Sequence, residues 1–369
     1  MTMQSKRRKN ATMALALLSS LHRSASSFSY RATAAFNHQH NIRTTHIHRL
    51  KSTSRDDPTL TTEPTCYNHL RDSRPIRIHA APLLQPRNAI ESRATLTNMN
   101  NDDSNNNISS SKSITTKKLV HFQRHGQGTH NQLYQQYTLR TGTPIDLSET
   151  NPELNPLLLP NIIDAPLTDK GREQCVQQRR EVADYLGGVE LIVVSPLVRA
   201  LETASITFDD YLPNKNNNND DVSGEGVRWI AHEGIREELG LLLCNQRRPL
   251  KETVVEFPHM DFSLLGDQEE DLYWKEYCEQ TVQNTEDGIP QRESMEDMSH
   301  RAYEFLVEYL CQRPEEEIAV VGHSAWLLAM TNAVLEFDEG SGGDVEEFGT
   351  MFGQAELRSA VLTFTERCD

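Results

Sequence analysis

The most informative segment for the fold class is Lys118-Leu119-Val120-His121-Phe122-Gln123-Arg124-His125-Gly126. Its first half is a mostly apolar run, which predicts a buried strand over Lys118–Phe122. The run leads into a guanidinium, an imidazole and a glycine, so these groups lie at the carboxyl end of the predicted strand. In open α/β sheets that end of the strands carries the ligand site. Arg124 and His125 are therefore candidate functional residues.

Other runs along the chain predict the remaining elements. Apolar segments predict further strands at Glu190–Val194, Ile318–Val321 and Leu357–Phe364. Helical patterns lie between them, with Thr168 as a good N-cap for a helix that ends near Leu186 and Ser195-Pro196 as the start of the next. A third helix places apolar side chains from Ala302 to Leu310 on one face. Alternating strands and helices predict a three-layer α/β/α sandwich with a mostly parallel sheet.

Three of the predicted strands end in polar groups that suit an anion. The first leads into Arg124-His125, the second into Ser195 with Arg199 one turn later, and the third into Gly322-His323-Ser324. Because the carboxyl ends of parallel strands meet at one edge of a sheet, two imidazoles and two guanidiniums are expected to converge there, beside helix N-termini that favour anions. The sequence therefore predicts a phosphate site.

Charge is distributed unevenly along the 369 residues. Residues 1–116 carry 16 Lys and Arg against 7 Asp and Glu, a net charge of +9, whereas the remainder carries 21 against 46, a net charge of −25. An acidic body repels phosphate backbones and anionic lipid, which argues against nucleic-acid binding and membrane attachment as its main function. The six cysteines lack Cys-x-x-Cys spacing, so neither a zinc knuckle nor a dense disulfide framework is indicated.

The chain divides into three parts by composition. Residues 1–94 are expected to be a presequence and a poorly ordered N-terminal segment, since no acidic residue precedes Asp56 and basic, Ser and Thr residues are frequent. An organelle, plastid or mitochondrion, is the expected location. The apolar run Ala11–Leu21 leaves secretion open as an alternative. The remaining alternative is a disordered N-terminal tail without a targeting function on a cytoplasmic protein. Residues 95–116 form an Asn/Ser-rich linker, and residues 117–369 form the predicted catalytic domain.

From Lys117 to Asp369 the chain resembles the histidine phosphatase superfamily, the phosphoglycerate-mutase-like proteins, whose hallmark is Arg-His-Gly after the first strand. The ordered set that carries this resemblance is Arg124-His125-Gly126, Asn131, Asp164-Ala165-Pro166-Leu167-Thr168, Gly171, Ser195-Pro196-Leu197-Val198-Arg199 and Gly322-His323. The plant and fungal branch is the most similar, through segments such as Arg236-Glu237-Glu238-Leu239-Gly240. One departure is Gln354, which stands where such proteins usually have Asn.

The resemblance implies a phosphomonoester phosphatase acting on a small phosphorylated metabolite. His125 would attack phosphorus and become a phosphohistidine, and His323 would complete the catalytic pair. The phosphoryl oxygens would be held by Arg124, Arg199 and His323, with Asn131 as a further polar contact. Glu237 would act as general acid and then as general base, with the adjacent Glu238 as the alternative. No metal and no cofactor are implied.

Other functions remain open at this stage. A mutase would return the phosphoryl group to a sugar acid, but glycolytic mutases have Glu-Ser-type residues after Arg-His-Gly, where this chain has Gln127-Gly128-Thr129. A non-catalytic phosphate-binding protein could carry the same charged groups. His121, His125 and His130 could instead bind a metal, although no acidic or cysteine ligand motif accompanies them. A serine hydrolase centred on Ser324 is disfavoured because no histidine follows that serine.

Overall fold

The structure is a computed structural model that describes residues 68–83, 92–93, 115–213, 226–266, 269–285, 288–337 and 343–366. Most of the predicted presequence and linker lies outside the described residues. So do Asn216–Asn219 and most of Gly340–Gly343, whose compositions predict surface loops. Among the described residues, no helix combines the length and apolarity that crossing a bilayer would require.

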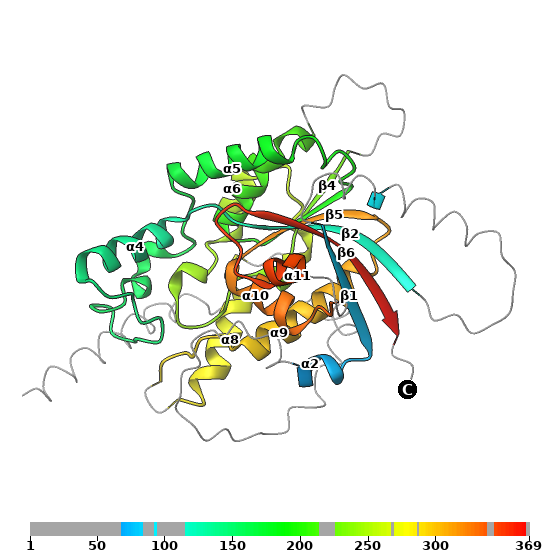
Figure 1. The fold of residues 1–369 in the computed structure, drawn as a ribbon. Coiled ribbons are helices and arrows are strands. Elements are labelled where there is room, and N and C mark those ends of the chain that lie inside the picture. The colour runs from blue at the N-terminus through cyan, green and yellow to red at the C-terminus, as the bar shows by residue number, and fades with distance from the viewer. Residues whose placement is uncertain are drawn as a thin grey trace, which may run out of the picture. The chain divides into compact units, whose positions relative to one another are not determined.

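A six-stranded sheet forms the centre of the described domain (Figure 1). Its strands are β1 (Ile76–Leu83), β2 (Thr115–Arg124), β3 (Leu191–Val194), β4 (Arg228–Ala231), β5 (Glu317–Gly322) and β6 (Leu357–Glu366). They lie in the order β1-β6-β2-β5-β3-β4. The four strands from β2 to β4 in this order are parallel, whereas β6 runs antiparallel to both β2 and β1. The predicted mostly parallel sheet is confirmed, and so are all four predicted strands.

The register of the parallel strands aligns the residues that follow them. Arg124 of β2 pairs with Gly322 of β5, and Val194 of β3 pairs with Val321 of β5. The backbone N–H groups of His125 and Ser195 then donate to the carbonyl oxygens of Gly322 and Val321 over 3.0 Å each. All three predicted functional strand ends therefore meet at one edge of the sheet.

Helices cover both faces of the sheet, as the three-layer prediction requires (Figure 1). α5 (Asp169–Val182) and α6 (Val198–Thr207) lie on one face, and α9 (Met295–Glu304), the π-helical turn η9 (Phe305–Leu310), α10 (Ser324–Ala333) and α11 (Gly343–Gly349) lie on the other. The peripheral helices are α2 (Asn68–Asp72), α4 (Thr129–Thr141), α7 (Leu250–Glu256) and α8 (Leu272–Val282), with short 3-10 turns η3 (Pro156–Leu158), η4 (Pro160–Ile162), η5 (Asp209–Tyr211), η6 (Glu233–Ile235), η7 (Leu243–Asn245) and η8 (Ser263–Leu265).

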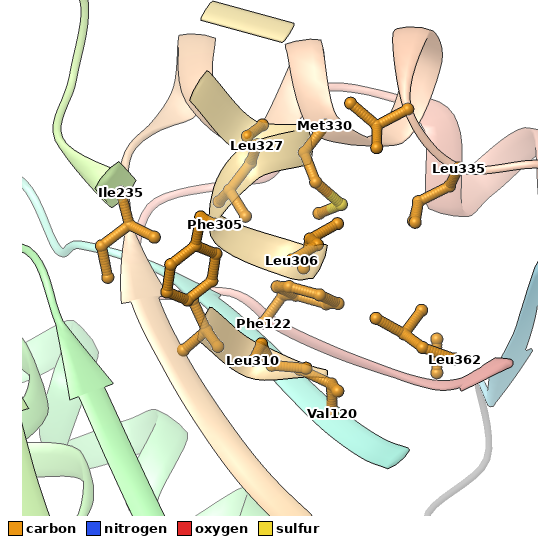
Figure 2. Close-up of a cluster of buried hydrophobic side chains, with 14 of the residues drawn as sticks. Val120, Phe122, Ile235, Phe305, Leu306, Leu310, Leu327, Met330, Leu335 and Leu362 are labelled. Carbon is orange, nitrogen blue, oxygen red and sulfur yellow. The ribbon is translucent and has the colours of Figure 1, made fainter. Parts of the chain in front are cut away.

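The larger of the two main hydrophobic clusters fixes β5 and α10 relative to β2. Figure 2 shows Phe122 of β2 beneath Leu306 of η9 and Met330 of α10. All three side chains are fully buried. Burying a large apolar side chain contributes roughly 1.5–3 kcal/mol, so the cluster holds the strand end at Arg124 and the helix start at Ser324 in one rigid frame.

Two features of the fold differ from the prediction. Residues 68–83, assigned above to the poorly ordered N-terminal segment, form α2 and the edge strand β1, whose eight residues pair with β6. Ser195 does not cap the following helix, because the backbone N–H of Val198 donates to the carboxylate of Asp164 over 2.8 Å. Thr168 does cap α5 as expected, since its hydroxyl oxygen accepts from the N–H of Gly171.

Candidate functional site

His125 occupies the first position beyond β2, and its backbone is held on both sides. Its N–H donates to Gly322 and its carbonyl oxygen accepts from Ala355. The ring Nδ1 lies 2.6 Å from the carbonyl oxygen of Gly126. Because a carbonyl oxygen can only accept, Nδ1 carries the proton, which leaves the lone pair on Nε2. Nε2 is therefore the ring nitrogen of His125 that could act as a nucleophile.

His323 lies beside His125, at the junction of β5 and α10. The two ring centroids are 5.0 Å apart with an interplanar angle of 59°. Nε2 of His323 lies 2.7 Å from the hydroxyl oxygen of Ser195, and its Nδ1 is buried without a partner. One polar atom next to His125 is thus left ready for a ligand, since buried polar groups normally have partners.

Arg199 brings a buried positive charge to the two imidazoles. It follows the first residue of α6, and its side chain is fully buried. Its Nη1 and Nη2 donate to the carbonyl oxygen of Cys244 and to Oδ1 of Asn245, each over 2.8 Å. Its Nε donates toward Nε2 of His125 over 3.3 Å. Sequence analysis assigned no role to Asn245, which orients this guanidinium.

Arg124 adds a second guanidinium at the end of β2. Its Nη1 donates to the carbonyl oxygen of Phe352 over 2.6 Å, and its Nε is buried without a partner. Within the described part of the chain, the hydrogen bonds of Arg124 and Arg199 all go to uncharged acceptors. A buried guanidinium at Arg199 and a half-buried one at Arg124, with no carboxylate hydrogen-bonded to either among the described residues, are costly unless an anion binds between them.

These charges also set the protonation of the histidines. Burial, and then the guanidinium of Arg199, lowers the pKa of His125 well below its ordinary value. The same two causes, in the same order, lower the pKa of His323. Both imidazoles are consequently neutral near pH 7, which is the form in which Nε2 of His125 can attack an electrophile.

Glu237 and Glu238 have different surroundings. One carboxylate oxygen of Glu237 accepts from the hydroxyl of Ser324 over 3.3 Å and from the N–H of Ala325 over 3.5 Å, at the start of α10. Both carboxylate oxygens of Glu238 instead pair with the guanidinium of Arg292. Glu237 therefore contacts the two residues that follow His323, whereas Glu238 forms a salt bridge with Arg292.

The first turn of α4 brings Asn131 and His130 near the same loop. Oδ1 of Asn131 accepts from the N–H of Gly128 over 3.0 Å, so this predicted substrate contact also caps the helix. The ring centroid of His130 lies 5.5 Å from that of His125. Sequence reasoning considered His130 only as a metal ligand. Its place directly before Asn131 was the available signal, but its approach to His125 depends on the turn at Gly128.

Comparisons with known proteins show which family the chain belongs to. The sequence profile of the histidine phosphatase superfamily (branch 1) matches residues 159–212 and 246–347. Phosphoglycerate mutase-like protein 1 of Arabidopsis thaliana is 31% identical over 261 residues, which cover 66% of this chain and 81% of that protein. The chain belongs to the histidine phosphatase superfamily.

Two further proteins similar to this chain are named as phosphatases. A probable phosphatase of Schizosaccharomyces pombe is 25% identical over 211 residues, covering 56% of this chain and 74% of that protein. Among solved structures, a phosphoserine phosphatase mutant from Entamoeba histolytica in complex with phosphoserine aligns at 17% identity and a TM-score of 0.34, covering 66% of this chain and 94% of the other.

The loop that carries the superfamily's Arg-His-Gly motif packs so closely against α5 that two of its contact positions cannot accommodate a side chain. A Cβ atom at Gly126 would lie 2.6 Å from the carbonyl oxygen of Gly171, and one at Gly171 would lie 2.2 Å from that of Gln127. Both positions therefore require glycine. The Thr168 hydroxyl that caps α5 also donates to the side chain of Gln127 over 2.9 Å, which ties the loop to the helix start.

The residues of the two alternative chemistries can also be placed in the structure. His121 is directed away from His125, because its ring contacts the hydroxyl of Ser359 and the carboxylate of Glu317. Among the described residues, no group of three or more His, Cys, Asp or Glu side chains is arranged to hold a metal ion. The hydroxyl of Ser324 contacts Glu237, a carboxylate, and not the imidazole that a serine hydrolase requires.

Proposed function

We propose that this protein is a phosphomonoester phosphatase that acts on a small phosphorylated metabolite through a phosphohistidine at His125. The observation that carries the proposal is the pair of guanidiniums, Arg124 and Arg199, beside that imidazole. Their hydrogen bonds to other described residues go to uncharged acceptors. A phosphoryl dianion between them would supply the missing negative charge, and guanidinium forks match phosphoryl oxygens in shape.

In the first step, the lone pair on Nε2 of His125 attacks phosphorus and the bond to the ester oxygen breaks. Arg124, Arg199 and Nδ1 of His323 hold the phosphoryl oxygens, and Asn131 contributes its amide. The carboxyl group of Glu237 gives a proton to the departing oxygen. Phosphoryl transfer depends mainly on positioning and electrostatic stabilisation, which preorganised guanidiniums in a water-poor site supply.

In the second step, water replaces the alcohol. The Glu237 carboxylate takes a proton from water, the resulting oxygen nucleophile attacks phosphorus, and the phosphorus–nitrogen bond breaks. Inorganic phosphate leaves and His125 regains its lone pair on Nε2. Each step uses side chains of this chain alone, so the proposed cycle requires neither a metal nor a cofactor.

A mutase is the second candidate within the same chemistry. The residue after the Arg-His-Gly motif is Gln127, whose side chain contacts Thr168 and Gln135. A side chain engaged in this way supports the loop and is not free to grip a second charged group of the substrate. We therefore favour hydrolysis. Interconversion of phosphoglycerates faster than phosphate release would reverse this preference.

A non-catalytic phosphate-binding protein is the third candidate, and one assay separates it from an enzyme. Purified protein is incubated with a generic aryl phosphate, beside a His125→Ala variant and a His259→Ala control whose imidazole contacts Ser205 on α6. We expect release of phosphate by the wild type and by the control, and none by His125→Ala. Equal release by all three proteins, or none by any, would contradict the proposal.

The N-terminal composition motivates a separate proposal about location. The basic, Ser- and Thr-rich residues 1–94 are proposed to direct the protein to a plastid or mitochondrion. A fluorescent fusion to about the first 100 residues, a span chosen from the composition break, tests this by microscopy. Diffuse cytoplasmic fluorescence or secretion of the fusion would contradict import.

A further inference from the structure

His130 is a third imidazole at the site to which the superfamily mechanism above assigns no role. Its ring centroid lies 5.5 Å from that of His125 with an interplanar angle of 54°. Since His323 lies 5.0 Å away, the nucleophile has an imidazole neighbour in each of two other elements. Nδ1 of His130 is buried without a hydrogen-bond partner.

The position of this ring depends on Gly128. A Cβ atom at Gly128 would lie 2.6 Å from both Cε1 and Nδ1 of His130. The same point would lie 3.5 Å from Cδ of Arg199. The absence of a side chain at residue 128 therefore lets the ring of His130 fold back from α4 toward Arg199 and His125.

The surroundings of His130 are positively charged. Burial, and then the charges of Arg199 and Arg124, lowers the pKa of its imidazole well below the ordinary value. The ring is thus neutral and retains one N–H donor and one acceptor nitrogen. A phosphoryl dianion would offset the two guanidinium charges and would favour an N–H donor directed at it.

We propose that His130 is a phosphate-binding residue that donates a hydrogen bond to the phosphoryl group held by Arg124 and Arg199. This inference rests on the proposed function only in placing phosphate beside His125. It assigns an imidazole on α4, outside the strand ends that carry the other groups, to recognition of the anion. It also gives Gly128 a role, which is to leave room for that imidazole.

Binding of inorganic phosphate, measured by calorimetry at pH 7, tests the proposal without turnover. His130→Phe keeps the ring volume but has no donor, whereas His130→Gln keeps a donor. We expect phosphate binding about tenfold weaker in His130→Phe, the loss of one hydrogen bond to a charged group, and a smaller loss in His130→Gln. Wild-type affinity in a folded His130→Phe variant would overturn the proposal, because the ring would then serve packing alone.

Gly128→Ala provides a second test that leaves His130 itself unchanged. The new methyl group would displace the ring, so we expect weaker phosphate binding in the same direction as His130→Phe. Unchanged binding would overturn the proposal even if His130→Phe failed to fold. Because these assays need no hydrolysis, a protein that binds phosphate through His130 but cleaves no phosphomonoester would refute the phosphatase function and leave this inference intact.

Discussion

Arg199 donates its Nε–H toward Nε2 of His125 across 3.3 Å, and its other two nitrogens are held by the 244–245 turn. The guanidinium is therefore held in one orientation by the protein itself, with its Nε–H directed at the ring nitrogen that would attack phosphorus in the proposed mechanism. Preorganised donors of this kind are typically the largest single contribution to catalysis of charged transition states.

Replacing Arg199 by Lys should reduce activity strongly although the charge is kept. Lysine cannot contact Cys244, Asn245 and the phosphoryl group at once, so we expect kcat/KM for an aryl phosphate to fall by about 10²–10³-fold. Arg179→Lys is the matched control, because that arginine pairs with Asp210 at the surface. Similar losses in the two variants would show that the orientation of Arg199 is unimportant.

Glu237 and Glu238 should respond differently to amidation. Glu237→Gln removes the proposed acid and base, so we expect kcat to fall by about 10²–10⁴-fold with little change in folding. Glu238→Gln removes the carboxylate charge from the salt bridge with Arg292 and should mainly lower stability. Steady-state kinetics and denaturant unfolding of both variants check this. A larger loss of kcat in Glu238→Gln would exchange the two roles.

Gly171→Ala should disturb the loop that follows Arg124-His125-Gly126, because this loop packs against α5. The added Cβ would lie 2.2 Å from the carbonyl oxygen of Gln127, which is backbone and cannot rotate away. Overpacking of this kind costs about 1–3 kcal/mol, and we expect the free energy of unfolding and kcat/KM to fall together. Gly187→Ala is the control, since nothing lies within 4 Å of its Cβ position. Wild-type stability of Gly171→Ala would contradict the tight contact.

His232 should make the protein sensitive to acid. Its Nδ1 accepts from the N–H of Gly234 over 2.9 Å, and burial lowers its pKa to about 4. An unfolded histidine has a pKa of about 6.5, so the stabilising effect of the neutral ring is present above that pH and is lost as pH falls from about 6.5 to 4.

Comparing wild type with His232→Asn isolates this effect, because Asn can still accept from Gly234 but does not titrate. Between pH 7 and pH 5 the wild type should lose about 1–2 kcal/mol more unfolding free energy than the variant. Denaturant titrations at both pH values measure the difference. Equal losses would mean that His232 is accessible to protons in the folded state.

The strands were predictable where burial is continuous and not where it is partial. β2, β3 and β5 are apolar runs covered on both faces, which is the pattern that sequence analysis detects most readily. In β1, Arg77 and His79 alternate with apolar residues, and Pro82 is tolerated because β1 is an edge strand. In a basic segment, these polar residues and the proline make the strand hard to predict from the sequence. β4 has only four residues beside an Asn-rich stretch.

The site residues were predictable from their order along the chain, whereas their partners were not. His125, Arg199 and His323 follow strands, so sheet topology alone brings them together. Ser195 contacts His323 and does not cap α6, because Asp164 reaches the helix start from a distant segment. The approach of His130 depends on Gly128 in the same way. Long-range contacts of this kind leave no periodic signal in a sequence.

The proposed mechanism requires a covalent bond between phosphorus and His125, and this bond can be trapped. Protein mixed briefly with an aryl phosphate is quenched in alkali, where phosphohistidine survives, and digested for mass spectrometry. We expect a phosphate adduct on the peptide that contains His125, its accumulation in Glu237→Gln, and its absence in His125→Ala. Rapid phosphate release by the wild type with no adduct on His125 at any time would contradict the account.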